Sequence, residues 1–110
     1  MLSFKNRLKK EKDFKRVFDY GKSISSDLIS VKYLINEMEN SRVGFIVSKK
    51  VSKKAVLRNR IKRVLRESVR KEIKQLNRGY DIIIIARRKT TETESKEIFK
   101  TVEDLFKSIR

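Results

Sequence analysis

The chain has 110 residues and a formal net charge of +16, because 30 Lys and Arg face only 14 Asp and Glu. A chain of this length folds as one domain around one modest core, so we take residues 1–110 as a single domain. It contains neither Cys nor His. That excludes a disulfide framework, a thiol nucleophile, a zinc ribbon and the commonest general base in enzymes.

Targeting and membrane segments are not apparent in the sequence. The first 18 residues carry charges every few positions, unlike a signal peptide. No apolar run approaches the roughly 20 residues of a membrane span. The sequence therefore predicts a soluble, cytoplasmic protein, and the net charge predicts a polyanionic partner.

The first elements in chain order are a helix and a strand. Apolar residues recur at helical spacing in residues 11–20. Residues 28–35 alternate as in a strand, which puts Ile29, Val31 and Tyr33 on one face.

The remaining elements follow the same rules. The pattern of residues 43–48 predicts a strand that forms a hairpin with the preceding one, and residues 23–25 are predicted to add a short edge strand. Apolar residues at helical spacing predict the longest helix at residues 54–77. Residues 80–87 contain four consecutive Ile and predict a strand covered on both faces. A last helix begins near residue 94, with a clean apolar stripe.

These elements together predict an α+β fold. We expect a compact α/β sandwich in which a mainly antiparallel, four-stranded sheet packs with three helices. The predicted order along the chain is α-β-β-β-α-β-α.

Most of the excess positive charge lies in two blocks of the chain, and the first, residues 1–22, has a net charge of +5. Residues 48–74 carry twelve basic and two acidic side chains, a net charge of +10, whereas residues 89–110 carry five of each. In the predicted long helix, Arg58, Lys62, Arg66 and Arg70 form a row at i, i+4 spacing. Like charges at this spacing destabilise an isolated helix, so the row favours an anionic partner. The alternative is a solvated helix face, but such a face would mix Glu with Lys, as residues 92–107 do.

Aromatic side chains form a second group of candidates. Phe14 and Phe18 share one face of the first helix, and Tyr33 lies in mid-strand. Beside a basic groove, such rings can stack on unpaired bases. The alternative is that they belong to the core.

The carboxylates do not suggest catalysis by the protein itself. Asp13, Glu67 and Asp81 are the candidates, and each has a simpler structural explanation at a helix start, in an intrahelical pair or at a strand start. No acidic cluster has the spacing of a divalent metal site. A protein lying on anionic membranes is also disfavoured, because the basic helix lacks Trp or Phe anchors.

Residues 58–66 read RNRIKRVLR, with Ala55 three residues upstream. This motif resembles the signature of the protein subunit of bacterial ribonuclease P. The similarity covers essentially the whole chain, in the right order and at the right length. Further matching segments are residues 6–21, 42–50 and 80–87.

The resemblance implies both a topology and a function. The basic helix would join two parallel strands by a left-handed crossover, which is rare because about 98% of such connections are right-handed. The protein would bind a large catalytic RNA and the single-stranded 5′ leader of precursor tRNA, as a monomer in a ribonucleoprotein. The RNA with its bound Mg²⁺ would hydrolyse the tRNA precursor, and the protein would hold neither a catalytic residue nor a metal site. The alternative is a small ribosomal-type or general RNA-binding protein without a processing role.

The resemblance also implies two sets of site residues. The leader-binding cleft would contain Phe14, Phe18, Tyr33, Arg58, Asn59, Lys62 and Arg66. The surface for the catalytic RNA would contain Arg7, Lys9, Lys10, Lys49, Lys50, Lys53, Lys54, Arg60 and Arg63.

Overall fold

Four strands form one mixed sheet in the spatial order β1-β2-β4-β3. Strand β4 is antiparallel to β2 and parallel to β3, and β1 pairs antiparallel with β2. The computed structural model describes residues 3–109, without the side chain of Phe4. The strands are β1 (Lys22–Ser25), β2 (Ile29–Ile35), β3 (Arg42–Ile46) and β4 (Tyr80–Ala86).

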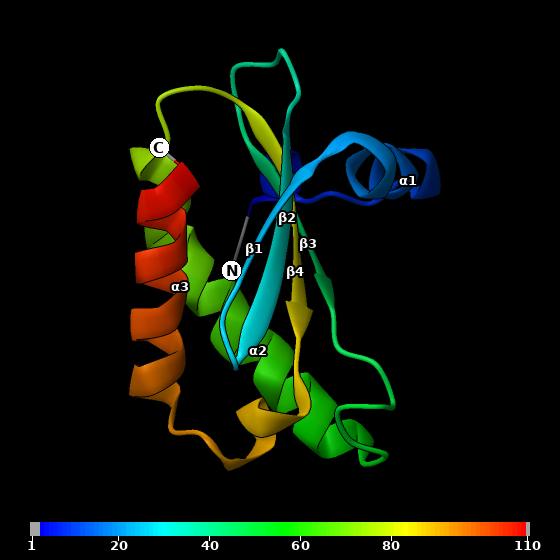
Figure 1. The fold of residues 1–110 in the computed structure, drawn as a ribbon, viewed down its shortest axis with the longest axis vertical. Helices are drawn as coiled ribbons and strands as arrows, with labels where there is room; N and C mark the ends of the chain where they lie inside the picture. Colours follow the sequence, from blue (N-terminus) through cyan, green and yellow to red (C-terminus); the bar gives the residue numbers. More distant parts are fainter. Residues whose placement is uncertain (1–2, 110) are drawn as a thin grey trace.

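The helices lie in two layers on opposite faces of this sheet. Figure 1 shows α1 on one face and both α2 and α3 on the other. The predicted α+β fold is confirmed, including the element order and the mainly antiparallel sheet. The predicted long helix ends sooner than expected, because its last turn tightens into a 3₁₀ helix. The helices are α1 (Glu11–Tyr20), α2 (Ala55–Glu72) and α3 (Ser95–Ile109), with 3₁₀ helices η1 (Phe4–Asn6), η2 (Ile73–Gln75) and η3 (Arg88–Glu92).

The predicted hairpin between β2 and β3 is wrong, because β4 lies between them. The four Ile of β4 explain its central position. Ile82 and Ile84 belong to the main core beneath α2 and α3, whereas Ile83 belongs to a smaller core beneath α1, and all three are fully buried. A strand with apolar side chains on both faces needs cover on both sides, which only a central position supplies.

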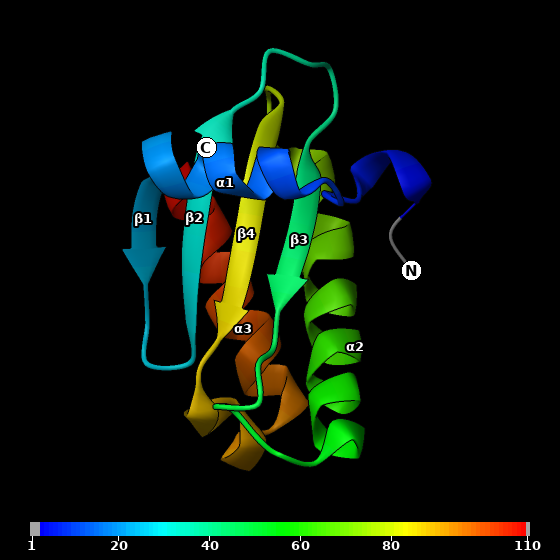
Figure 2. The same ribbon diagram turned by 90° about the vertical axis from the view of Figure 1, so that its right-hand side faces the viewer.

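The connection from β3 through α2 to β4 is left-handed. In Figure 2, β3 and β4 point the same way, α2 lies behind the sheet, and β4 lies to the left of β3. This confirms the topology that the family resemblance implied and that hydrophobic periodicity cannot supply. Because of it, the basic helix runs behind the exposed edge strand β3.

Helix α1 covers only one end of its face of the sheet (Figure 2). Its Val17 is fully buried in the smaller core, but Ile46 and Ile85 on the same sheet face are only half-buried. The uncovered part of this face is therefore open beside α1. Within residues 3–109, no helix is both long and apolar enough to cross a membrane.

Candidate nucleic-acid interface

A groove follows the exposed edge of β3, between α2 and the segment that leads into α1. It encloses about 350 Å³. The leading segment is held in place because the backbone N–H of Leu8 donates to the carbonyl oxygen of Val43 at 3.0 Å. We call this feature the β3-edge groove. It is lined by Arg7, Leu8, Lys9, Phe14, Val43, Gly44, Phe45, Lys62 and Arg66.

Phe14 can line this groove because the strand beneath it carries a glycine. A Cβ placed on Gly44 would overlap the Phe14 ring, with ring carbons Cε1 and Cε2 at 2.8 and 3.2 Å and Cζ closer still. The ring therefore lies directly on the backbone of β3. Phe14 packs against the smaller core but stays half-buried, so part of the ring is available to a ligand.

Phe18 lies one turn further along α1 and is 42% exposed. The ammonium of Lys32 lies over its ring, 5.8 Å from the centroid, and donates a hydrogen bond to Ser23 Oγ at 2.8 Å. A cation held against an aromatic face is a suitable contact for an RNA phosphate next to a stacked base. The sequence interpretation did not include Lys32, although strand alternation places it on the α1 face.

Tyr33 does not lie with Phe14 and Phe18, which corrects its expected place in the cleft. Its side chain is on the opposite face of the sheet, packed against the main core. There its ring makes an edge-to-face contact with Tyr80, with centroids 6.0 Å apart and an interplanar angle of 72°. The physical reason is the two-residue period of a strand, since Ile29, Val31 and Tyr33 share one face.

The predicted basic row of α2 is divided among different places, and its last member, Arg70, lines a separate cavity near the end of α2. Lys62 and Arg66 line the β3-edge groove. Arg58 instead turns back to the preceding loop, where its Nη1 donates to the carbonyl oxygen of Ser52 at 2.9 Å. Asn59 is exposed beside this row. Arg58 thus fixes the loop before α2, whereas Lys62 and Arg66 point to the groove.

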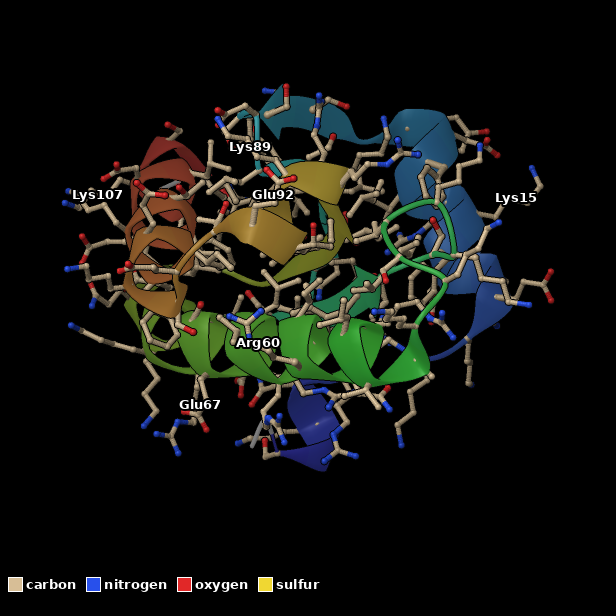
Figure 3. The ribbon with its side chains drawn as sticks, turned by 90° about the horizontal axis from the view of Figure 1, so that it is seen from below. Lys15, Arg60, Glu67, Lys89, Glu92 and Lys107 are labelled. Carbon is tan, nitrogen blue, oxygen red and sulfur yellow. The ribbon has the colours of Figure 1, made fainter. Side chains whose placement is uncertain are left out.

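The cations assigned to the catalytic RNA fall in three places. Arg7 and Lys9 line the β3-edge groove, together with the leader residues. Arg60 is half-buried on the side of α2 that faces η3, away from the groove (Figure 3). The remaining predicted cations are exposed at the start of α1, in the loop before α2 and on α2: Lys10, Lys49, Lys50, Lys53, Lys54 and Arg63.

Arg88 joins this loop although the sequence interpretation missed it. Its Nε donates to the carbonyl oxygen of Lys50 at 3.2 Å. The only sequence signal was the pair Arg87-Arg88 after a buried strand. The contact brings η3 beside the basic loop, so segments almost 40 residues apart form one positive end of the molecule.

A buried carboxylate ties α1 to the sheet. The Asp81 side chain is fully buried and accepts two hydrogen bonds from Arg42, at 2.9 and 2.7 Å, one from Arg16 at 3.0 Å and one from Asn36 at 2.9 Å. Burial alone would raise the pKa of Asp81, but the hydrogen bonds from Arg42, Asn36 and Arg16 outweigh it and lower the pKa below its usual value. Asp13 adds a second contact to Arg42 at 3.4 Å. This network fixes α1, and with it the two phenylalanines, over the sheet.

The other candidate carboxylate also has a structural role. Glu67 pairs with Arg70 on the exposed surface of α2 at 3.2 Å. Among the described residues, no three His, Cys, Asp or Glu side chains are grouped so that they could hold a metal ion. The chemistry that this surface offers is therefore binding of an anionic polymer, through cations and two partly exposed rings.

Comparison with known proteins identifies the family. The model of the ribonuclease P family matches residues 2–110. The chain belongs to the ribonuclease P protein family. Ribonuclease P protein components from Caldanaerobacter subterraneus and Clostridioides difficile are 40% and 41% identical to it, over 92% and 91% of this chain and 86% and 88% of theirs.

Solved ribonuclease P proteins also share the fold. A mutant from Staphylococcus aureus superposes with a TM-score of 0.88 at 34% identity, covering 96% of this chain and 88% of the other. The protein from Thermotoga maritima gives 0.85 at 32% identity, covering 94% and 97%. Relatives and structural neighbours are thus ribonuclease P protein subunits, and membership of this family assigns the chain to tRNA processing with a partner RNA in a ribonucleoprotein.

Proposed function

We propose that this chain, as the protein subunit of ribonuclease P, binds both the catalytic RNA and the single-stranded 5′ leader of precursor tRNA. It acts as a monomer in a cytoplasmic ribonucleoprotein and promotes endonucleolytic cleavage at the 5′ end of the tRNA. The observation that carries the proposal is the β3-edge groove, where Phe14 lies between cations of α2 and of the N-terminal segment.

The groove and the adjoining sheet face suit a single strand. Phe14 and Phe18 each present part of a ring, which supports stacking of unpaired bases. Lys62, Arg66 and Lys32 lie beside those rings and neutralise phosphates. Stacking on a ring is largely independent of base identity, so this arrangement fits leaders of varied sequence.

The catalytic RNA would contact the positive end of the molecule. We assign this role to the loop before α2, the start of α2 and Arg88, where exposed cations are densest. Arg suits such a surface because its planar guanidinium can bind a phosphate through two hydrogen bonds. Arg58, which is bound to that loop, lies between the two surfaces and would keep their spacing fixed.

Mg²⁺ belongs to the RNA in this proposal. A protein site for Mg²⁺ needs carboxylate oxygens open to the ion, and both oxygens of the buried Asp81 are already bound by Arg and Asn donors. Asp81 is therefore closed to Mg²⁺, and the described part of the chain holds no group of three His, Cys, Asp or Glu side chains that could bind a metal ion. The part of the protein is to bind and orient RNA, while the hydrolytic step is left to the RNA.

The test is cleavage of precursor tRNA by a bacterial catalytic RNA at low Mg²⁺, with and without this protein. The protein should stimulate cleavage, and the holoenzyme should bind precursor tRNA more tightly than mature tRNA. A control variant is Lys96→Ala/Lys107→Ala, which removes two positive charges from the neutral α3, away from both proposed surfaces. It should preserve both effects. Stimulation without preference for the precursor would instead indicate a general RNA-binding protein, and no stimulation would refute the proposal.

A further inference from the structure

A second basic cavity lies near the C-terminal end of α2, outside the two sets of site residues that the resemblance implied. It encloses about 480 Å³ between η1, the turn that joins β2 to β3, and the end of α2. We call it the N-terminal pocket. Its lining includes four cations and one carboxylate, namely Lys5, Arg70, Lys74, Arg78 and Glu39.

The walls of the N-terminal pocket are held by specific hydrogen bonds. The Asn6 side-chain amide donates to the carbonyl oxygen of Ser41 at 2.8 Å, and the Asn40 amide donates to that of Lys5 at 2.8 Å. Ser41 Oγ in turn donates to the carbonyl oxygen of Arg78 at 3.3 Å and accepts from the backbone N–H of Tyr80 at 2.9 Å. Three segments distant in sequence are thus joined, and the pocket exists before any ligand enters it.

The cations of the N-terminal pocket are poorly neutralised by the protein. Of the four, Arg70 pairs with Glu67 on the exposed surface. Within residues 3–109, Lys5, Lys74 and Arg78 have no carboxylate within 4.0 Å. Several unpaired cations around a preformed polar cavity favour an anionic ligand with spaced charges, such as a phosphodiester backbone.

The position of this pocket indicates which RNA would enter it. Lys62 and Arg66 line the β3-edge groove, and Arg70, the next member of the same i, i+4 row, lines the N-terminal pocket together with Lys74 of η2, so one row serves both. Successive members of such a row are about 6 Å apart along a helix axis. The opposite wall is also shared, because η1 lines the pocket and the residues directly after it line the groove.

We propose that the N-terminal pocket binds the phosphodiester backbone of the leader beyond the part held in the β3-edge groove. This inference rests on the proposed function, since it extends the leader path along α2. It predicts that Lys74 and Arg78 contribute only to leaders long enough to reach them. Neither residue belongs to the groove or to the surface assigned to the catalytic RNA.

The test measures the affinity of the reconstituted holoenzyme for precursors whose leaders lengthen one nucleotide at a time. In the natural protein, affinity should rise with leader length and then level off. The double variant Lys74→Ala/Arg78→Ala should level off at a shorter leader, with a loss of about 3- to 10-fold for long leaders only. Its salt dependence for long leaders should fall by about 1.4 in log–log slope, from two lost single-strand phosphate contacts. Glu39→Gln, which removes the carboxylate from the lining, should strengthen binding of long leaders.

The controls separate the possible failures. Lys96→Ala/Lys107→Ala lowers the net charge equally and should leave the length profile unchanged. If Lys74→Ala/Arg78→Ala weakens all leaders and the catalytic RNA alone to the same extent, the pocket binds the catalytic RNA and the inference is overturned. An unchanged profile overturns it as well. If the natural protein itself shows no leader dependence, the proposed function fails before this inference is reached.

Discussion

The contact between Gly44 and Phe14 gives the sharpest prediction about the groove. Gly44 has no left-handed backbone conformation, so alanine can adopt its backbone angles. The added Cβ would nevertheless meet three ring carbons of Phe14 at 3.2 Å or less, where ordinary contacts are 3.4–4 Å. Gly44→Ala must therefore push the ring off the strand by a few tenths of an ångström or more.

The expected cost has two parts. Overpacking of this kind destabilises a folded protein by about 1–3 kcal/mol. Displacement of the stacking ring should also weaken leader binding by up to about 1–3 kcal/mol, or roughly 5- to 150-fold. Urea unfolding followed by circular dichroism measures the first effect. The ratio of precursor to mature tRNA affinity in the holoenzyme measures the second.

A double-mutant cycle shows whether the ring is the cause. In a Phe14→Ala background the added Cβ meets no ring, so Gly44→Ala should change stability by less than about 0.5 kcal/mol. The coupling between the two positions should then be about 1 kcal/mol or more. Equal costs of Gly44→Ala in both backgrounds would refute the reasoning, because the penalty would then come from the backbone and not from Phe14.

Three further variants test the support of α1 and the two faces of β2. Asp81→Asn should destabilise the protein by about 2–4 kcal/mol, less than for a wholly buried pair because Arg42 and Arg16 are partly exposed. The pKa of Asp81 is lowered in the folded state, so its contribution to the free energy of unfolding is present above the unfolded pKa of about 3.9 and is lost as pH falls through the folded pKa. Urea unfolding of the natural protein and of Asp81→Asn should therefore show a stability difference that shrinks below about pH 4. A stability difference that does not change with pH would contradict this. Tyr33→Leu should cost about 1 kcal/mol of stability through the lost contact with Tyr80 but leave leader preference unchanged. Lys32→Ala should lower the log–log salt slope of leader binding by about 0.7. If Tyr33→Leu weakens leader preference while Lys32→Ala leaves the salt slope unchanged, Tyr33 belongs to the cleft after all.

Tyr33 shows where a family resemblance and local physics disagreed. Its alternation with Ile29 and Val31 already placed it on the core face, whereas the resemblance assigned it to the leader cleft. The structure agrees with the alternation, since a shift of one residue in a strand moves a side chain to the opposite face. Lys32 is the residue of β2 that approaches Phe18.

The hairpin prediction failed for a different reason. Nothing local in β2 and β3 forbids pairing across a short polar turn. Whether β2 and β3 pair depends on β4. Its continuous apolar sequence requires a central position in the sheet, and β4 therefore separates the two strands. Sequence neighbours often pair, but a distant strand with two apolar faces can take precedence.

The sequence by itself determined the helix and strand content, the concentration of charge near α2 and the motif that resembles the ribonuclease P protein. These features depend on local periodicity and composition, which one chain displays directly. Only the tertiary structure decided which cations lie together, because α2 distributes its basic side chains among the β3-edge groove, the loop before it and the N-terminal pocket. It also decided that Asp81 supports α1, since the partners of that carboxylate come from α1, from the turn after β2 and from β3. Such groupings arise from long-range packing, and residue spacing along the chain records only the part that falls on one helix, such as Lys62 beside Arg66.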